Sequence, residues 1–254
     1  MIGQEALALA ERAAREAGRF LAASQRRAAT IAAETARDVK LQADRAAEDR
    51  IVDILAAHSH IPIVAEERVA DARVVPVGGL RWIVDPLDGT MNFLQGIPFC
   101  CVSVALWRDD DPVAGVVYDF DRDEMFSALV GVGAWLNGSA IRVRNVPPAR
   151  AVLCTGFPAG TDFTPSAVSR FVEQVIAFKK IRLLGSAALS LAYVAAGRAD
   201  AYFERDIKIW DVAAGLALVR AAGGDVLRAP SSLDHGLTVY AHNGACPWPE
   251  PILA

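Results

Sequence analysis

The most constraining feature of the chain is an apolar segment that runs directly into two carboxylates, a glycine and a hydroxyl. Trp82–Val84 predicts a short interior strand, because the run is apolar and bounded by turn signals. Pro86 cannot donate to a strand ladder, so it should block further pairing, and Gly89 permits a tight turn after it. The sequence therefore puts Asp85 and Asp88 at the carboxyl end of a buried strand.

These residue types indicate phosphate chemistry. Asp85 and Asp88 are three residues apart on a turn and can converge on a hard cation, for which carboxylate oxygens are good ligands. The amides of Gly89 and Thr90, at the start of an expected helix, are donors suited to a phosphate. A bare D-x-x-D-G is also typical of an Asp-Pro turn followed by an Asp N-cap, so the interpretation requires ligands from elsewhere.

Two distant segments offer such ligands, again where an apolar run ends. Ile61–Ala65 leads into Glu66, and Ala201–Glu204 leads to Asp211 just before a helical pattern. Taken singly, Glu66 fits a solvated strand end and Asp211 fits a helix N-cap. Taken together with the first pair of carboxylates, they predict one metal site assembled from three parts of the chain.

Three segments carry a family resemblance, and they stand in the correct order along almost the whole chain. They are Trp82–Phe93 (W-I-V-D-P-L-D-G-T-M-N-F), Gly185–Gly197 and Trp210–Gly215 (W-D-V-A-A-G). With these segments the chain resembles the inositol monophosphatase family of magnesium-dependent, lithium-sensitive sugar phosphatases. The resemblance implies an α/β (α+β layered) fold in which helix and sheet layers alternate as α-β-α-β-α.

The resemblance also implies roles for individual residues. The implied magnesium ligands, for two or three ions, are Glu66, Asp85, the backbone carbonyl of Leu87, Asp88 and Asp211. Thr90 would work with Glu66 on the attacking water, and Asp44 would support Thr90 from behind. The residues expected to contact phosphate or substrate are Gly89, Thr90, Ser186, Ala187 and Glu204.

A phosphate monoester dianion resists nucleophiles, so its charge must be neutralised before water can attack. We therefore expect a magnesium-dependent phosphomonoesterase that uses metal-activated water, with inositol monophosphate as the leading substrate. Within the resemblance, Asn92-Phe93 after Thr90 favours the inositol monophosphatase branch over the bisphosphate nucleotidase branch, and Glu204 favours a polyol. Histidinol phosphate, fructose 1,6-bisphosphate and 3′-phosphoadenosine 5′-phosphate stay open as substrates, and so does a role as a protein-binding regulator of the transcription machinery.

Hydrophobic periodicity predicts two opening helices, at 6–26 and 43–57, separated by a loop at 27–42 without clean periodicity. Antiparallel strands are expected next, with Asn137-Gly138 as a hairpin signal. These strands are 100–107, 112–119, 124–130 and 134–136. Strands at 151–155, 180–183 and 201–204 should then alternate with helices at 165–178, 186–196 and 210–222. We expect a single domain over 1–254, with an internal seam near 145–150 and an extended tail at 247–251.

Composition narrows the class of protein further. At 254 residues with 53% hydrophobic residues the chain can bury a large core. A net charge of −4 gives no general basic field, so no nucleic-acid partner is expected. Four cysteines without C-x-x-C spacing suggest reduced thiols. We expect no membrane span and no targeting segment, hence a cytoplasmic protein, and by resemblance alone a homodimer.

Overall fold

The computed structural model of the chain describes residues 2–24, 31–34, 39–69, 79–158, 161–231 and 233–246. Its helices are α1 (Ile2–Ala23), α2 (Gln42–His58), α3 (Glu66–Val69), α4 (Thr90–Gln95), α5 (Pro165–Val175), α6 (Ala187–Ala195) and α7 (Ile209–Ala221). A 3-10 helix, η2, covers Pro148–Arg150.

The strands form three sheets. The small one pairs β1 (Ile31–Glu34) with β2 (Val39–Leu41). The seven-stranded sheet has the order β3 (Ile63–Ala65), β4 (Leu80–Asp88), β5 (Cys101–Arg108), β6 (Asp111–Asp119), β7 (Glu124–Leu129), β8 (Gly133–Leu136), β9 (Ser139–Ile141). The five-stranded sheet has the order β11 (Lys180–Leu183), β10 (Val152–Thr155), β12 (Ala201–Lys208), β14 (Gly236–His242), β13 (Asp225–Pro230).

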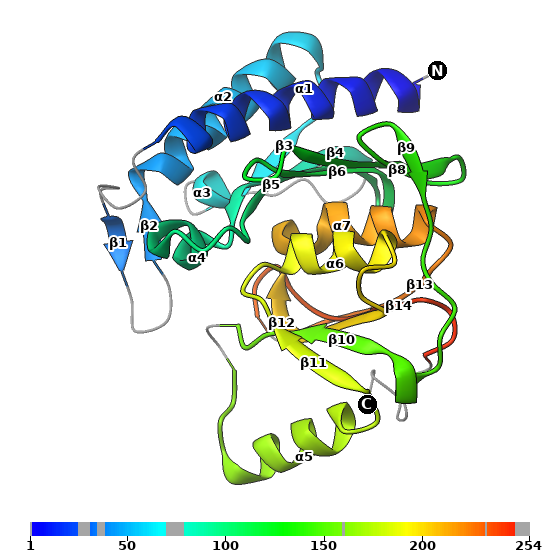
Figure 1. Cartoon of the computed structure of the whole chain (residues 1–254). Helices are drawn as coiled ribbons and strands as arrows, with labels where there is room; N and C mark the ends of the chain where they lie inside the picture. Colours follow the sequence, from blue (N-terminus) through cyan, green and yellow to red (C-terminus); the bar gives the residue numbers. More distant parts are fainter. Residues whose placement is uncertain are drawn as a thin grey trace.

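The elements stack in five layers (Figure 1). Helices α1 and α2 cover the outer face of the seven-stranded sheet, α6 and α7 lie between the two large sheets, and α5 lies beyond the five-stranded sheet. This arrangement confirms the predicted α/β layered class with alternating α-β-α-β-α order. Among the described residues, no helix combines the length and the apolar composition needed to cross a bilayer.

The seven-stranded sheet is mostly a meander of chain neighbours. Its strands pair antiparallel from β4 to β9, and β3 joins its edge in parallel with β4. The hairpin between β8 and β9 turns at Asn137 (φ 48°) and Gly138 (φ 81°), both in the left-handed region that a type I′ turn requires. The Asn-Gly signal in the sequence is therefore confirmed.

The five-stranded sheet is mixed. Strands β11 and β12 both pair in parallel with β10, so α5 and α6 serve as crossover connections, while β14 pairs antiparallel with β12 and β13. The parallel pairs put the carboxyl ends of β10 and β12 at the same edge of the sheet. This edge faces the candidate site described below.

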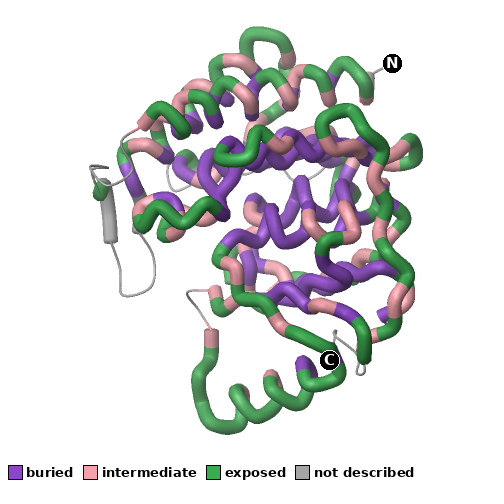
Figure 2. Tube along the Cα trace, in the orientation of Figure 1, coloured by how far each residue is buried: buried purple, intermediate pink, exposed green. Residues whose placement is uncertain are grey.

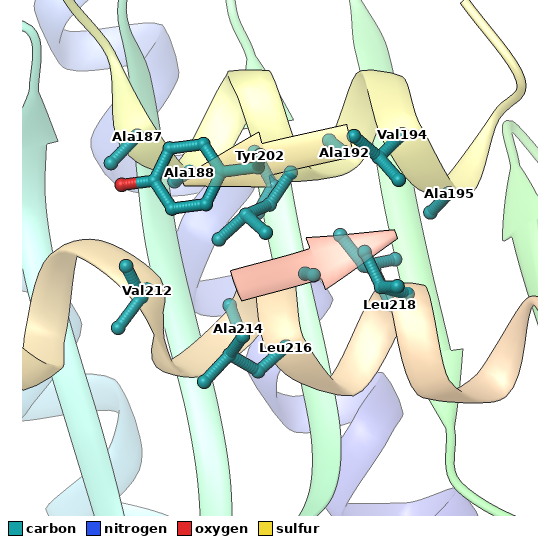
Figure 3. Close-up of a cluster of buried hydrophobic side chains, with 14 of the residues drawn as sticks. Ala187, Ala188, Ala192, Val194, Ala195, Tyr202, Val212, Ala214, Leu216 and Leu218 are labelled. Atoms are coloured by element: carbon teal, nitrogen blue, oxygen red, sulfur yellow. The ribbon is translucent and has the colours of Figure 1, made fainter. Parts of the chain in front are cut away.

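The central core explains why the middle helices are apolar on all sides. Buried residues are concentrated in the sheets and in α6 and α7, whereas α1 exposes one face and α5 is exposed along most of its length (Figure 2). Figure 3 shows the central contact, where Tyr202 of β12 lies among small and branched side chains of the two helices. A helix held between two sheets has no solvent face, so a polar stripe would be costly there.

Helix α7 approaches the seven-stranded sheet closely because a glycine faces it. A Cβ built on Gly115 would lie 2.4 Å from the carbonyl oxygen of Ala214 and 2.8 Å from the Cβ of Ala217. No side chain fits in this space. The contact sets the depth at which α7 lies, and α7 carries one of the predicted metal ligands in its first turn.

Most predicted elements occur within a few residues of their expected bounds, with three corrections. The stretch 27–42, predicted to be a loop, contains the strands β1 and β2, which at four and three residues are too short to show an alternating pattern. The strands β13 and β14 were not predicted. The strand from Trp82 does not end before Pro86 but continues to Asp88. The predicted tail at 247–251 lies outside the described residues, and the seam near 145–150 stays a prediction.

We expect Gly115→Ala to lower the free energy of unfolding by about 1–3 kcal/mol, the usual cost of overpacking a filled core. Chemical denaturation measured by circular dichroism would give this value. Gly133→Ala in the same sheet is the matched control, because its new methyl group would meet only the ring edge of Trp135 at 3.3 Å. Equal losses in the two variants would contradict close packing of α7 as the cause.

Candidate active site

A bulge in β4 brings two carboxylates to the same face of the sheet. Asp85 pairs with Ser103, and Asp88 pairs with Cys101. Between these two pairs the chain advances by three residues on β4 and by only two on β5, so β4 contains one extra residue. Without the extra residue, Asp85 and Asp88 would point to opposite faces, because side chains alternate along a strand. Cys101 belongs to the core under α6 and α7, whereas Leu87 packs in the core on the opposite face. Both carboxylates therefore face α6 and α7.

Two further elements complete a cluster of three carboxylates. Glu66 opens α3 immediately after β3, which is parallel to β4, so Glu66 lies at the same sheet edge as Asp85. Asp211 lies in the first turn of α7, where the positive end of the helix dipole favours a negative charge. One ligand oxygen from each of Glu66, Asp85 and Asp211 lies within 4.8 Å of the other two. The structure thus brings together ligands predicted from three distant segments.

Asp88 lies beside this cluster but is held by the start of α6. Its carboxylate accepts hydrogen bonds from the Ser186 hydroxyl at 2.6 Å and from the amides of Ala188 at 2.7 Å and Ala187 at 3.3 Å. Burial raises the pKa of Asp88 to about 6, although these donors lower it. Asp88 therefore ties β4 to α6 through its carboxylate oxygens.

The turn after Asp88 is locked by backbone geometry and packing. Gly89 has φ 89°, and a Cβ at this position would lie 2.9 Å from the carbonyl oxygen of Phe99. The Thr90 hydroxyl donates to the carbonyl oxygen of Leu87 at 3.1 Å, and the Leu87 amide donates to Asp85 at 2.9 Å. A substitution at Gly89 would therefore displace the carbonyl and hydroxyl groups that were predicted as site groups.

Asn92 anchors this turn to the next layer. Its side-chain amide donates to the carbonyl oxygens of Phe99 and Leu184, both at 2.8 Å. Leu184 precedes the Gly185-Ser186 segment that begins α6. One side chain thus fixes α4 against α6 at the edge of the site.

A cavity of about 320 Å³ opens over the cluster. It is lined by Glu66, Asp85, Leu87, Asp88, Gly89, Thr90 and Asp211 among the predicted residues. Sequence reasoning missed Asp206, Lys208 and Trp210, which also line it. These three residues lie in the sequence between the predicted residues Glu204 and Asp211. That position could have indicated that they line the site.

The cluster is electrostatically unfavourable as it stands. Burial raises the pKa of Asp85 well above its ordinary value of 3.8, and neighbouring carboxylates raise it further, in the order Glu66, Asp88, Asp211. Burial also raises the pKa of Asp211, again with Glu66 and Asp88 as the next causes. Like charges at this separation cannot all ionise without a compensating cation.

The donor set fits a hard divalent cation. The converging atoms are carboxylate oxygens with a backbone carbonyl beside them, as magnesium prefers. A soft group also lies beside the site, the thiol of Cys101, whose sulfur is 3.8 Å from a carboxylate oxygen of Asp88. Burial, and then the charges of Asp88 and Asp85, raise the pKa of this thiol well above its ordinary value, so it stays protonated and disfavours zinc.

Four predicted residues, Asp44, Ser186, Ala187 and Glu204, lie outside the cluster of three carboxylates. Asp44 accepts a hydrogen bond from the Leu41 amide at 2.8 Å and so caps α2, and its support of Thr90 stays a prediction. Ser186 and Ala187 contact the site through Asp88. Glu204 is buried and lines a neighbouring cavity, which it shares with aromatic rings.

Burial raises the pKa of Glu204 to about 8, despite an opposing effect of the Tyr202 hydroxyl, and the charge of Asp88 raises it further. A carboxyl with this pKa is largely protonated at neutral pH. It can then donate a hydrogen bond as well as accept one.

Comparison with known proteins places these features in a family. The family model described as "Inositol monophosphatase family" matches residues 3–250. The chain is 41% identical over 226 residues to "Nus factor SuhB" of Xylella fastidiosa, covering 85% of this chain and 78% of that protein. It is also 41% identical over 212 residues to "Inositol-1-monophosphatase" of Mesorhizobium japonicum, covering 80% and 77%.

Solved structures agree with this result. An inositol monophosphatase from Anabaena (Nostoc) superposes with a TM-score of 0.82 at 33% identity, covering 96% of this chain and 93% of that one. The extragenic suppressor protein suhB from Bartonella henselae superposes with a TM-score of 0.81 at 35% identity, covering 95% of both chains. The likeness therefore extends over all the layers described above.

The raised pKa values predict how the stability of the metal-free chain depends on pH. Asp88 binds its proton more tightly in the folded chain, so its contribution is fully present below its ordinary pKa of 3.8 and is lost as the pH rises through about 6. The Asp88→Asn side chain carries no charge at any pH. In EDTA, we expect the Tm of the wild type to fall relative to that of Asp88→Asn over this window, and Mg²⁺ to reverse the fall.

Thermal unfolding at several pH values measures this difference directly. Carboxylates remote from Asp88 titrate equally in both proteins and cancel in the comparison, whereas Asp85, Asp211 and Glu204 lose the repulsion of Asp88 in the variant, which adds to the expected difference. A difference in Tm that does not change with pH would mean that Asp88 is not crowded by the other carboxylates. Asp53→Asn, an exposed change on α2, is the control and should leave the difference from the wild type near zero.

Proposed function

The chain belongs to the inositol monophosphatase family, and from this membership we propose that it is a Mg²⁺-dependent phosphomonoesterase acting on a small phosphorylated polyol. The family consists of phosphoric monoester hydrolases, and the leading substrate is inositol monophosphate. The observation that carries the proposal is the convergence of Glu66, Asp85 and Asp211 within 4.8 Å in a cavity large enough for a small phosphate ester.

In this proposal Glu66, Asp85, the Leu87 carbonyl, Asp88 and Asp211 would hold the cations, two or three in number. Bound there, magnesium would neutralise the phosphate charge and lower the pKa of a coordinated water. The Leu87 carbonyl oxygen has two lone pairs, so its hydrogen bond from Thr90 does not prevent it from serving as a ligand. The acidic lining itself argues for cations, because it would otherwise repel a phosphate dianion.

The residues of the chain supply the proton transfer and the orientation. Glu66 accepts a proton from the attacking water as general base. Thr90 already donates its hydroxyl proton to Leu87, which leaves its oxygen lone pairs to accept a hydrogen bond from that water and to aim it at phosphorus. The amide groups at the start of α4 donate to phosphate oxygens. The bond between phosphorus and the ester oxygen then breaks, and that oxygen takes up a proton from solvent, so the products are the alcohol and inorganic phosphate.

The identity of the alcohol is the less constrained part of the proposal. Histidinol phosphate, fructose 1,6-bisphosphate and 3′-phosphoadenosine 5′-phosphate contain the same phosphate group, and a centre that recognises phosphate discriminates weakly among them. A Mg²⁺-dependent phosphate-release screen over inositol, sugar, histidinol and nucleotide phosphates tests the reaction. No release from any of them would overturn the proposed function.

A second candidate role is protein binding as a regulator of the transcription machinery. It is favoured by relatives that carry the name "Nus factor SuhB" with similar identity and coverage. This role does not require turnover. Capture of a defined partner from cell extract by an inactive Asp85→Asn variant would support it, and capture of none would leave the phosphatase reaction as the sole proposal.

We expect Asp85→Asn to reduce kcat/KM for phosphate release by at least about 10²-fold, because the variant lacks a ligand charge at the centre of the cluster. The fold should persist, since Asn keeps the oxygen that accepts from the Leu87 amide. Circular dichroism and a colorimetric phosphate assay measure the two effects. Asp53→Asn is again the control, and wild-type turnover by Asp85→Asn would refute the ligand assignment.

Glu66→Gln tests the general base separately. We expect kcat to fall by about 10²-fold or more, the usual range for a lost acid-base group, while competitive inhibition by inorganic phosphate changes less. Glutamine keeps the size and an oxygen ligand but cannot accept the proton. Equal losses in kcat and in phosphate binding would assign Glu66 to metal binding alone.

A further inference from the structure

Helix α3 is only one turn long, yet it begins at Glu66, the general base and cation ligand of the proposed function. The helix covers four residues, Glu66–Val69. Such a short helix has almost no stability of its own, because the first turn orders several residues for a single hydrogen bond. Its first amide groups also lack partners within the helix. The position of Glu66 therefore depends on the contacts that α3 makes with other elements.

Helix α2 supplies these contacts, chiefly through one buried carboxylate. Glu48 is fully buried and accepts a hydrogen bond from the Glu67 amide at 2.7 Å. This amide belongs to the planar peptide unit that joins Glu67 to Glu66, so the bond fixes the backbone of Glu66 directly. Arg45, also on α2, donates to the carbonyl oxygen of Glu67 at 3.4 Å. The residue after Glu66 is thus held on both of its backbone polar groups.

The second carboxylate oxygen of Glu48 faces the next residue of α3. It lies 3.2 Å from Nε of Arg68, whose side chain is 47% exposed. Arg68 also pairs with Asp49 of α2, with 2.6 Å between Nη2 and the carboxylate oxygen. Exposed ion pairs of this kind contribute little to stability. The buried bond from Glu48 to the Glu67 amide is therefore the stronger of the contacts that hold α3.

A carboxylate at position 48 is costly for the fold. Glu48 belongs to the buried face of α2, together with the apolar residues Ala47, Ile51 and Leu55. Taking a charge out of water costs free energy, and apolar replacements of buried charged groups are often neutral or stabilising. The position of Glu48 is better explained by the turn that it holds than by a gain in stability.

We propose that Glu48 is a positioning residue, which fixes the start of α3 so that the Glu66 carboxylate converges with those of Asp85 and Asp211. The inference rests on the proposed function and adds to it a residue that is not among the described residues lining the site cavity. Since Glu66 serves as ligand and as base, a change at Glu48 weakens cation binding and also slows the reaction.

Glu48→Gln and Glu48→Met separate the hydrogen bond from the bulk of the side chain. Glutamine keeps an oxygen that accepts from the Glu67 amide, whereas methionine has a similar length but only a weakly accepting sulfur. Mn²⁺ is the probe, because it takes oxygen ligands and its free ion is measured by electron paramagnetic resonance without any turnover. We expect the Kd for Mn²⁺ to rise about tenfold or more in Glu48→Met, as for other partners that orient a metal ligand. Glu48→Gln should stay close to the wild type.

Asp49→Met is the matched control. Asp49 is the next residue of α2, and its side chain is 56% exposed. This variant removes an ion pair between the two helices but leaves the Glu67 amide bonded to Glu48, so its Kd for Mn²⁺ should equal that of the wild type. A rise as large as that in Glu48→Met would overturn the specific role of Glu48.

A purely structural role of Glu48 predicts a different pattern. Glu48→Met would then lower the Tm in EDTA, while the folded protein, measured well below its Tm, would bind Mn²⁺ as the wild type does. That result would overturn the inference. If Glu48→Met does not fold, Glu48→Asp takes its place, because aspartate keeps the charge but is one methylene shorter and loses the bond to the Glu67 amide. It should raise the Kd for Mn²⁺ in the same way.

Turnover separates this inference from the proposed function. At saturating Mg²⁺ we expect kcat for inositol 1-phosphate to fall about tenfold or more in Glu48→Met, with a smaller change in KM. Phosphate release by the wild type, with unchanged Mn²⁺ binding in Glu48→Met, would overturn the inference and leave the proposed function standing. Weakened Mn²⁺ binding in Glu48→Met, without phosphate release from any ester by the wild type, would do the reverse.

Discussion

Repulsion among buried carboxylates is the constraint on which the rest of this structure depends. Three carboxylates converge within 4.8 Å, and burial together with mutual charge raises the pKa of Asp85 and of Asp211. Left alone, such a cluster would open or bind protons. The closely packed layers on both sides hold the three carboxylates together despite their repulsion. A bound cation would remove this repulsion.

Local irregularities of the backbone orient the side chains of the site. The bulge after Asp85 turns Asp88 to the same face, and the left-handed Gly89 reverses the chain so that Thr90 returns toward Leu87. A second bulge in β12, with Asp206 at φ 59°, lies across the cavity. The bulges and the left-handed residues occur where a side chain must depart from the alternation between the two faces of a strand. The regular strands next to them hold these positions in place.

The convergence of Glu66, Asp85 and Asp211 could be predicted because each of them follows an apolar run and the motifs are specific, while their role as metal ligands stays a prediction. The layer order followed from the resemblance, and the longer helices and strands from their periodicity. What could not be predicted depends on tertiary geometry. Nothing in the local pattern shows that Gln174 faces a cavity or that Lys208 lines the site, because a helix position shows its environment only once its neighbours are placed. The short strands β1 and β2 carry too few residues to show a period.

The arrangement of the layers also accounts for two cavities meeting at one place. Helices α6 and α7 both begin at the metal cavity, where Gly185 and Trp210 line it, so their positive ends converge on it. The carboxyl ends of β10 and β12 reach the same edge from the second sheet. The first sheet and the start of α7 supply the carboxylates, and the second sheet together with α5 supplies aromatic rings to the neighbouring cavity. The two adjoining cavities are thus built by different layers that meet at one edge of the molecule.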